Sequence, residues 1–258
     1  MKRLVIALIA LAALAATTDV AAEPSGDLAP PQPAFQPGVW APRVLAQAGA
    51  QAVDAEEDEG DYDPWESFNT KMFEFNRQVD RHALKPAAQG WDKATPVTFR
   101  QSLQNAVKNI GMPRRFVNSV LQGKFHGALR ELTRFIMNSS VGIGGLFDVA
   151  TPEGIPASEE DLGQTLGVYG IGPGPYLVLP FLPPLTVRDG VGFVGDLFLD
   201  PLNYVLPLGG RLGFFVGNAI NDRSLNLQLF EQVEADVFDL YSAVRNAYLQ
   251  RRQREIER

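Results

Sequence analysis

The sequence predicts an all-α protein built from short amphipathic helices, and three observations support this prediction. Apolar residues recur at three- and four-residue spacing in several successive segments, which is the period of a helix with one apolar face. Several of these segments begin with Asp, Ser or Thr followed three residues later by an acidic residue, a pattern typical of helix starts. The first half of the chain has no alternating runs joined by a two-residue turn, which argues against a β-sandwich or barrel.

The first 62 residues differ in composition from the rest of the chain. Residues 1–22 begin with Lys2 and Arg3, continue as an apolar stretch and end in Ala21-Ala22, which predicts a secretory signal peptide. Residues 23–62 are rich in Pro, Ala and Gln and carry eight acidic residues against one arginine. Such a segment buries too little apolar surface to fold, so we expect a disordered tether whose acidic run is a solvated spacer.

The folded part is predicted to be one helical domain over residues 63–252, followed by a polar C-terminal tail at 253–258. The chain contains no cysteine, which excludes disulfides, thiolate metal sites and a lipid-modified cysteine in this sequence. We therefore expect an exported protein that is not a lipoprotein, and any attachment to a membrane must come from other parts of the chain.

The first predicted helix extends from Asp63 to Asp80, with Asp63 as its N-cap and Pro64 in its first turn. An apolar face is predicted for Trp65, Phe68, Met72, Phe75 and Val79. Two asparagines, Asn69 and Asn76, lie seven residues apart beside this aromatic stripe. A buried carboxamide must find hydrogen-bond partners or face water, so the pair is either satisfied in the core or lines a polar passage.

Later helices are expected wherever the apolar period resumes, and Gly or Pro ends each of them. A broken connection is predicted at Leu84–Trp91. We expect Phe125, Leu129 and Ile136 on the buried face of their helix, with Glu131 and Arg134 on other faces. The predicted helices are Thr95–Ile110, Arg114–Leu121, Phe125–Ser139, Ser158–Leu166, Thr186–Phe198, Arg211–Ile220 and Leu225–Arg252.

The middle of the chain is apolar but cannot form one long helix. No Lys or Arg occurs between Arg134 and Arg188, and repeated Gly and Pro break the stretch Val168–Leu185. No run approaches the roughly 20 apolar residues of a helical membrane span. A water-soluble monomer would bury this stretch, whereas an exposed version would mark a membrane or partner surface.

The sequence offers no catalytic or cofactor motif. His82 and His126 lack the spacing of a zinc site, and no nucleophile elbow or Walker loop occurs. The Gly170–Gly174 stretch resembles a phosphate loop, but Pro173 removes a backbone donor from it. The folded part is nearly neutral, which gives no basic face for nucleic acid. We expect a protein that is not an enzyme, needs no cofactor or metal, and binds no nucleic acid.

Several motifs, in order along the chain, are similar to those of the MlaA family, also called VacJ, of outer-membrane lipid-asymmetry proteins. The first is the segment Asp63-Pro64-Trp65-Glu66-Ser67-Phe68-Asn69-Thr70-Lys71-Met72-Phe73-Glu74-Phe75-Asn76. The resemblance covers about Asp63 to Gln250. The later motifs are Pro113–Gly123, Arg134–Ser139, Gly142–Ala150, Leu162–Gly167, Gly172–Tyr176, Leu179-Pro180 and Thr186–Asp189.

The resemblance implies a ring of short helices embedded in the periplasmic leaflet of the outer membrane. It implies removal of mislocalised phospholipid from the outer leaflet through an amphipathic channel, with a trimeric porin and a periplasmic lipid carrier as partners. Asn69, Asn76, Arg188 and Asp189 are the expected channel residues, although Arg188 and Asp189 also fit a plain helix start. Contacts with membrane or partner are expected at Trp65, Phe68, Phe75, Tyr169, Tyr176, Leu179 and Phe181.

Two other functions fit the residues. A soluble periplasmic carrier would keep its apolar surface inside around one lipid. A structural protein associated with the porin would lie in the membrane without moving lipid.

Overall fold

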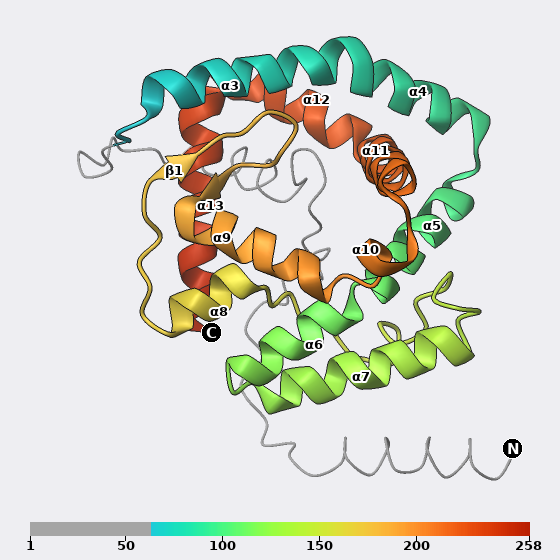
Figure 1. Ribbon diagram of the computed structural model, residues 1–258. Helices are drawn as coiled ribbons and strands as arrows, with labels where there is room; N and C mark the ends of the chain where they lie inside the picture. The colour runs from blue at the N-terminus through green and yellow to red at the C-terminus, as the bar shows by residue number, and fades with distance from the viewer. Residues whose placement is uncertain (1–62) are drawn as a thin grey trace, which may run out of the picture. The chain divides into compact units, whose positions relative to one another are not determined.

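The computed structural model describes residues 63–258, and the predicted signal peptide and tether lie outside the described residues. All described residues belong to one compact unit, within which the helices follow one another around a ring (Figure 1). The prediction of an all-α ring of short helices is confirmed. Its elements are α3 (Glu66–Val79), η1 (Asp80–Leu84), α4 (Lys85–Ala94), α5 (Val97–Ile110), α6 (Met112–Leu121), α7 (Phe125–Ser140), α8 (Leu162–Val168), β1 (Tyr176–Leu177), β2 (Leu185–Thr186), α9 (Val187–Asp196), η2 (Leu197–Leu199), α10 (Leu202–Val205), α11 (Leu208–Leu225), α12 (Leu227–Asp236) and α13 (Leu240–Glu257).

The first long helical segment is continuous from α3 to α4, so the broken connection predicted at Leu84–Trp91 is wrong. A π-helical turn, η1, joins the two helices. Pro86 lies in the first turn of α4, directly after the wider π turn in which the Lys85 N–H donates to the Asp80 carbonyl. The helix then ends at Ala94, and the Thr95 hydroxyl donates a hydrogen bond to the Trp91 carbonyl. Thr95 therefore closes α4 and does not cap α5.

Asp63 does not cap the first helix as the sequence predicts. The helix begins at Glu66, and the Asp63 carboxylate accepts a hydrogen bond from the Trp65 N–H at 2.9 Å. The same carboxylate accepts from the side chains of Asn69 and Tyr241. Asp63 thus fixes the start of the described chain to α3 and α13, which are far apart in sequence.

The later boundaries differ from the prediction where a tertiary contact or a tight turn takes precedence. The cap of α8 is Asp161, which accepts from the Gln164 N–H at 2.8 Å, and the predicted start at Ser158 is wrong. The last predicted helix is divided into α12 and α13, and α13 continues to Glu257. The cap at Thr186 is confirmed, since its hydroxyl oxygen accepts from the Asp189 N–H.

The apolar core lies where α13 packs against Tyr176 of the β1–β2 ladder and Phe73 of α3, and it continues to residues of α12. The ladder is antiparallel, with Tyr176 opposite Thr186 and Leu177 opposite Leu185. Phe73 of α3 meets Tyr241 of α13 edge to face at 5.6 Å between ring centres. The core residues are Phe73, Tyr176, Val178, Leu185, Phe230, Val233, Val237, Tyr241, Val244, Ala247 and Tyr248.

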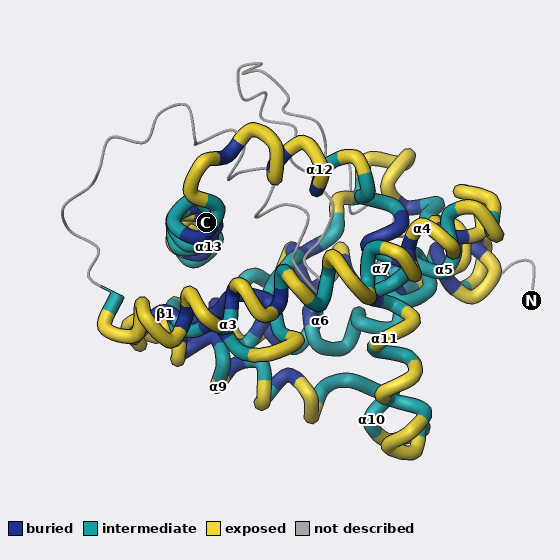
Figure 2. The backbone as a smooth tube through the Cα atoms, turned by 90° about the horizontal axis from the view of Figure 1, so that it is seen from above, coloured by how far each residue is buried: buried dark blue, intermediate teal, exposed yellow. Residues whose placement is uncertain are grey.

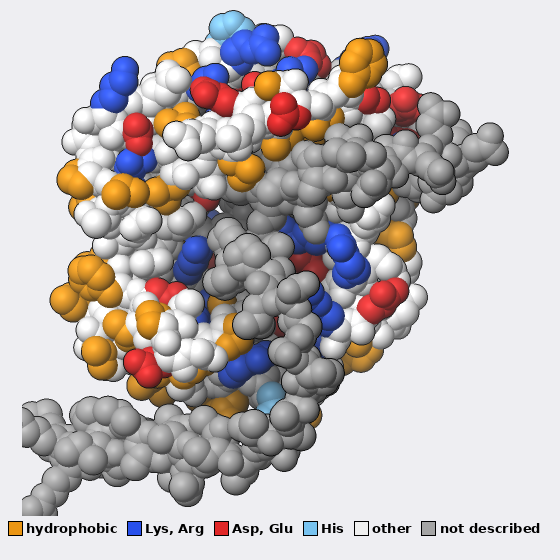
Figure 3. Space-filling model, turned by 180° about the vertical axis from the view of Figure 1, so that it is seen from behind, with side chains coloured by type: hydrophobic (Ala, Val, Ile, Leu, Met, Phe, Trp, Pro, Cys, Tyr) orange, Lys and Arg blue, Asp and Glu red, His pale blue; other side chains and the backbone are white. Residues whose placement is uncertain are grey.

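Several helices bury their polar face and expose their apolar face. In α7 the predicted burial is reversed, because Phe125 is 67% exposed while Glu131 is fully buried. Glu131 accepts from Arg115 at 2.7 Å and from the Ser158 N–H, and Arg134 donates to Asp148 at 2.9 Å. Figure 3 shows hydrophobic side chains along the sides and the lower edge of one face, with Lys and Arg side chains both around its middle and along its upper edge. Away from the apolar core, the inside of this domain is therefore held together by buried ion pairs and by hydrogen bonds between polar side chains.

Candidate functional site

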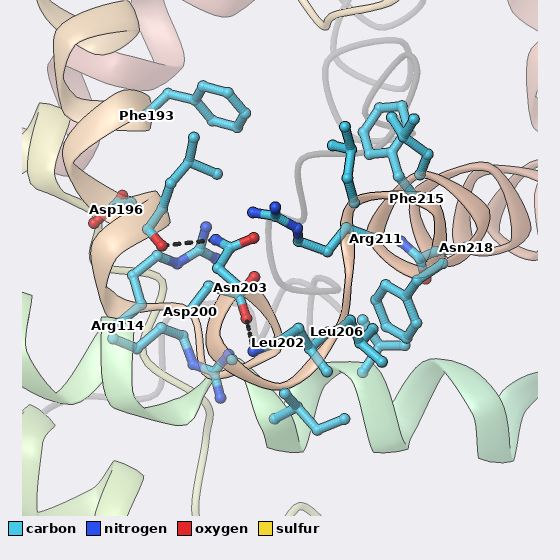
Figure 4. Close-up of a pocket in the computed structure, with 18 residues that line it drawn as sticks. Arg114, Phe193, Asp196, Asp200, Leu202, Asn203, Leu206, Arg211, Phe215 and Asn218 are labelled. Carbon is cyan, nitrogen blue, oxygen red and sulfur yellow. Dashed lines mark hydrogen bonds between the residues drawn. The ribbon is translucent and has the colours of Figure 1, made fainter.

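A cavity with a volume of about 320 Å³ lies between α9 and α11 and is also lined by residues of α5 and α6. The short segment from η2 through α10 closes one side of it. This volume falls within the usual range for small-molecule sites. Figure 4 shows Arg211 extending from α11 toward the space beside Phe193. The apolar part of the lining includes Val107, Ile110, Phe193, Leu197, Leu202, Leu206, Leu208, Leu212, Phe214 and Phe215.

Charged groups of both signs line the same cavity, and they differ in how far they are already paired. Arg115 is paired with Glu131. Asp196 accepts from the Asn118 side chain at 2.9 Å and from the Leu162 N–H at 3.1 Å. Burial raises the pKa of Asp196 to about 6, although Arg114 partly opposes this rise.

Arg114 and Arg211 differ from these groups because neither side chain makes a hydrogen bond or an ion pair within the part of the chain that the structure describes. The Nε atom of each is buried and unpartnered. An unpaired guanidinium in a partly buried position is costly, so an anionic or polar ligand would stabilise both. Neither residue is part of a sequence motif for a binding site, and their only signal in the sequence is a cation set among apolar residues.

Asn69 and Asn76 are buried and hold the segment from β1 to Phe181. The Asn69 side chain donates to the Tyr176 carbonyl and accepts from the Val178 N–H, both at 2.9 Å. Asn76 does the same with the Leu179 carbonyl and the Phe181 N–H. Each carboxamide thus takes the place of a neighbouring strand. Their place in a lipid path stays a prediction.

Arg188 and Asp189 belong to a buried ion network with the C-terminal helix. Asp189 pairs with Arg188 at 3.0 Å and with Arg252 at 2.8 Å, and Arg252 also pairs with Asp161 at 2.7 Å. Despite the opposing effect of burial, Arg252, the Tyr248 hydroxyl and Arg188 lower the pKa of Asp189 to about 2. Asp189 and Arg252 also line a small cavity of about 40 Å³ beside the first one.

The residues predicted to contact membrane or partner are mostly on the surface. Trp65, Phe68, Tyr169 and Phe181 are exposed. Leu179 is half-buried and Phe75 is exposed, with its ring edge-to-face on Phe181 at 5.5 Å. Tyr176 is the exception.

Tyr176 is buried in the core against Tyr241 and Tyr248, so its predicted surface contact is wrong. Alternate residues of a strand point to opposite faces, and β1 turns Tyr176 toward α13.

Exposed apolar side chains gather on α9, η2, α10 and α11, and three of them, Leu197, Leu208 and Leu212, also line the cavity. Phe198 is 72% exposed and Val205 is 77% exposed. We name this surface the apolar rim, and Figure 2 shows α10 with the adjoining ends of α9 and α11 projecting from one side of the ring. Its residues are Val191, Val194, Leu197, Phe198, Tyr204, Val205, Leu208, Leu212 and Val216. Among the described residues, no helix combines the length and apolar composition needed to cross a bilayer.

The fold and the site define a class of protein in which many charged side chains are buried and many apolar side chains are exposed, as expected for helices that lie in a membrane interface. Residues 61–255 match the family described as MlaA lipoprotein. Among relatives, the intermembrane phospholipid transport system lipoprotein MlaA of Escherichia coli is 35% identical over 198 residues, which cover 75% of this chain and 78% of the relative.

An uncharacterized protein of Rickettsia bellii is 36% identical over 197 residues, covering 76% of this chain and 77% of the relative. A solved structure from work on the structural basis for maintenance of bacterial outer membrane lipid asymmetry superposes with a TM-score of 0.68 and 33% identity. It covers 76% of this chain and 100% of the solved chain. The chain belongs to the MlaA family.

Proposed function

We propose that this protein helps to maintain outer-membrane lipid asymmetry by taking phospholipid from the outer leaflet through the ring toward the periplasm. The observation that carries the proposal is the cavity of about 320 Å³ in which unpaired Arg114 and Arg211 face apolar walls. A phospholipid has the matching chemistry, since a phosphate adjoins apolar chains. Bidentate contact with phosphate is a common use of arginine.

The position of the protein in the membrane follows from the apolar rim. Soluble monomers rarely expose a large group of neighbouring apolar side chains, so the apolar rim is proposed to lie among acyl chains. Helices of this kind bind a membrane by their buried apolar area, without spanning it. This attachment does not need a lipidated cysteine. The same exposure argues against a soluble carrier, which would turn its apolar side chains inward.

The four channel residues predicted from the sequence enter the proposal with different roles. Asn69 and Asn76 hold residues 176–181 in place as part of the wall. Asp189 lines the second cavity, and Arg188 orients it. A trimeric porin beside the exposed aromatic residues of α3 and a periplasmic carrier that receives the lipid complete the proposed path.

Deletion of the gene followed by complementation tests the proposal. Phospholipid in the outer leaflet is measured in the deletion strain and after return of the wild type, Arg211→Asp and Arg254→Asp. Arg254 is an exposed arginine of α13 outside the cavity and serves as the matched control. We expect surface phospholipid to rise on deletion and to fall again with wild type and Arg254→Asp, but not with Arg211→Asp.

Two outcomes would count against the proposal. Unchanged surface phospholipid on deletion would leave only a structural role beside the porin. Full rescue by Arg211→Asp would exclude the cavity as the lipid path. A further variant, Phe198→Asp in the apolar rim, is expected to move the protein from the outer-membrane fraction to the soluble periplasmic fraction.

A further inference from the structure

We propose that the cavity prefers phospholipids whose phosphate carries a primary amine, with Asp200 as the residue that recognises the ammonium group. In this arrangement Arg114 and Arg211 contact the phosphate. The inference rests on the proposed function, because it assumes that the cavity holds a lipid headgroup, and it goes further by assigning the class of headgroup.

The unpaired charges of the cavity match a headgroup with both signs. Of the five charged side chains in the lining, Arg115 and Asp196 are already satisfied by protein groups. Arg114, Arg211 and Asp200 make no ion pair in the region that the structure describes. Two cations and one carboxylate therefore remain for a ligand. An aminoethyl phosphodiester carries a negative phosphate and a positive ammonium two carbons away.

Asp200 is held in position to act as an acceptor. It lies between η2 and α10, and its Oδ1 accepts a hydrogen bond from the Leu202 N–H at 2.9 Å. Figure 4 shows this bond at the edge of the cavity, with Asn203 beside it. The second carboxylate oxygen, Oδ2, has no partner among the described residues. Because the turn fixes the side chain, the free oxygen loses little conformational entropy when a donor binds.

Other headgroups leave this carboxylate poorly matched. A glycerol headgroup offers hydroxyl donors but no positive charge, so the Asp200 charge is not neutralised. A choline headgroup has the charge but no N–H to donate. Both the glycerol hydroxyl and the ethanolamine ammonium can donate to the Asp200 carboxylate, but only the ammonium adds a positive charge, and we expect this charge to be worth roughly tenfold in affinity at a partly exposed site.

Competition among headgroups on the purified full chain in detergent tests the inference. Short-chain phosphatidylethanolamine, phosphatidylglycerol and phosphatidylcholine are mixed in equal amounts, and the lipid bound to the protein is counted by native mass spectrometry. We expect the wild type to prefer the ethanolamine lipid over the glycerol lipid about tenfold. Asp200→Asn is expected to lower this ratio at least about fivefold while total binding persists.

The control variants separate recognition from folding. Asp239→Asn changes a carboxylate that also accepts a backbone N–H, from Ser242, but lies outside the cavity. It should leave the ratio unchanged. Asp200→Ser keeps an acceptor for the Leu202 N–H without the charge, and it should behave like Asp200→Asn even if the latter folds poorly.

An unchanged headgroup ratio in both Asp200 variants, with lipid still bound, would overturn this inference and leave the proposed function standing. Absence of bound lipid from the wild type would overturn the proposed function and this inference with it. A fall in the binding of all three lipids with Arg211→Gln, at a constant ratio, would support the division of roles between phosphate and ammonium.

Discussion

Replacing Arg252 by alanine is expected to destabilise the contact between the C-terminal helix and the start of α9. Arg252 bridges two buried carboxylates, Asp161 and Asp189, through bonds of 2.7 to 3.1 Å. Without it, Arg188 remains the only cation paired with either carboxylate in the described residues. The variant therefore leaves two negative charges close together in a buried site.

The size of the effect follows from the burial and from the pKa of Asp189. Removing one partner of a buried ion pair costs about 3 to 5 kcal/mol, because the remaining charge stays desolvated. The pKa of Asp189 is lowered from 3.8 to about 2, which corresponds to about 2 kcal/mol of stability. A lowered pKa stabilises the fold above pH 3.8, and this contribution is lost as the pH falls toward 2.

Denaturant unfolding in mild detergent, followed by circular dichroism, measures this loss for Arg252→Ala. We expect a decrease of about 3 kcal/mol at pH 7. The difference in unfolding free energy from wild type should narrow as the pH falls to 5, because Asp161, which loses its ion-pair partner while Asp189 keeps Arg188, then takes up a proton. Arg254→Ala, an exposed arginine on the same helix, should change stability by less than about 0.5 kcal/mol.

The reasoning would be refuted by equal stability of Arg252→Ala and Arg254→Ala at pH 7. If the difference in unfolding free energy between wild type and Arg252→Ala stays constant between pH 7 and pH 5, the electrostatic explanation is refuted, although the structural role of Arg252 is not.

Three other changes are expected to have measurable effects. Asn76→Ala leaves the Leu179 carbonyl and the Phe181 N–H without their hydrogen-bond partner, so we expect the free energy of unfolding to fall by about 1 to 3 kcal/mol. Hydrogen exchange of the amides in residues 176–181 should become faster. Unchanged exchange would contradict the role of Asn76 in holding this segment. Burial raises the pKa of Asp222 to about 6, so the stability of the wild type falls as the pH rises from 4 through 6. Asp222→Asn should flatten this fall in denaturant unfolding and add about 1 to 3 kcal/mol of stability at pH 7. A pH profile as steep as that of the wild type would count against this explanation. Gly144 and Gly145 both have positive φ, but only at Gly145 would an added Cβ lie 2.6 Å from the Asn109 side chain of α5. Thermal unfolding should therefore show a lower melting temperature for Gly145→Ala than for Gly144→Ala. Equal melting temperatures would exclude the clash.

Local features of the sequence determined where most helices form, although several of their ends were set by tertiary contacts. The apolar period located α5, α6, α7 and α9, because helix formation needs only neighbouring residues at the right spacing. The Thr186 cap was predicted for the same reason, since its partner lies three residues away. The motifs in order also identified the family, which the match over residues 61–255 confirms.

Only the tertiary structure decided which face of each helix is buried. A periodic pattern divides a helix into an apolar and a polar face, but it does not state which one meets the solvent, and α7 and α9 expose the apolar one. The sequence also could not predict hydrogen bonds between residues far apart in the chain, such as the one between Asn69 and Val178, which are 109 residues apart. The cavity arginines Arg114 and Arg211 came together in the same way. Whether a helix buries its polar or its apolar face depends on the medium around the protein. The spacing of residues along one helix does not specify that medium.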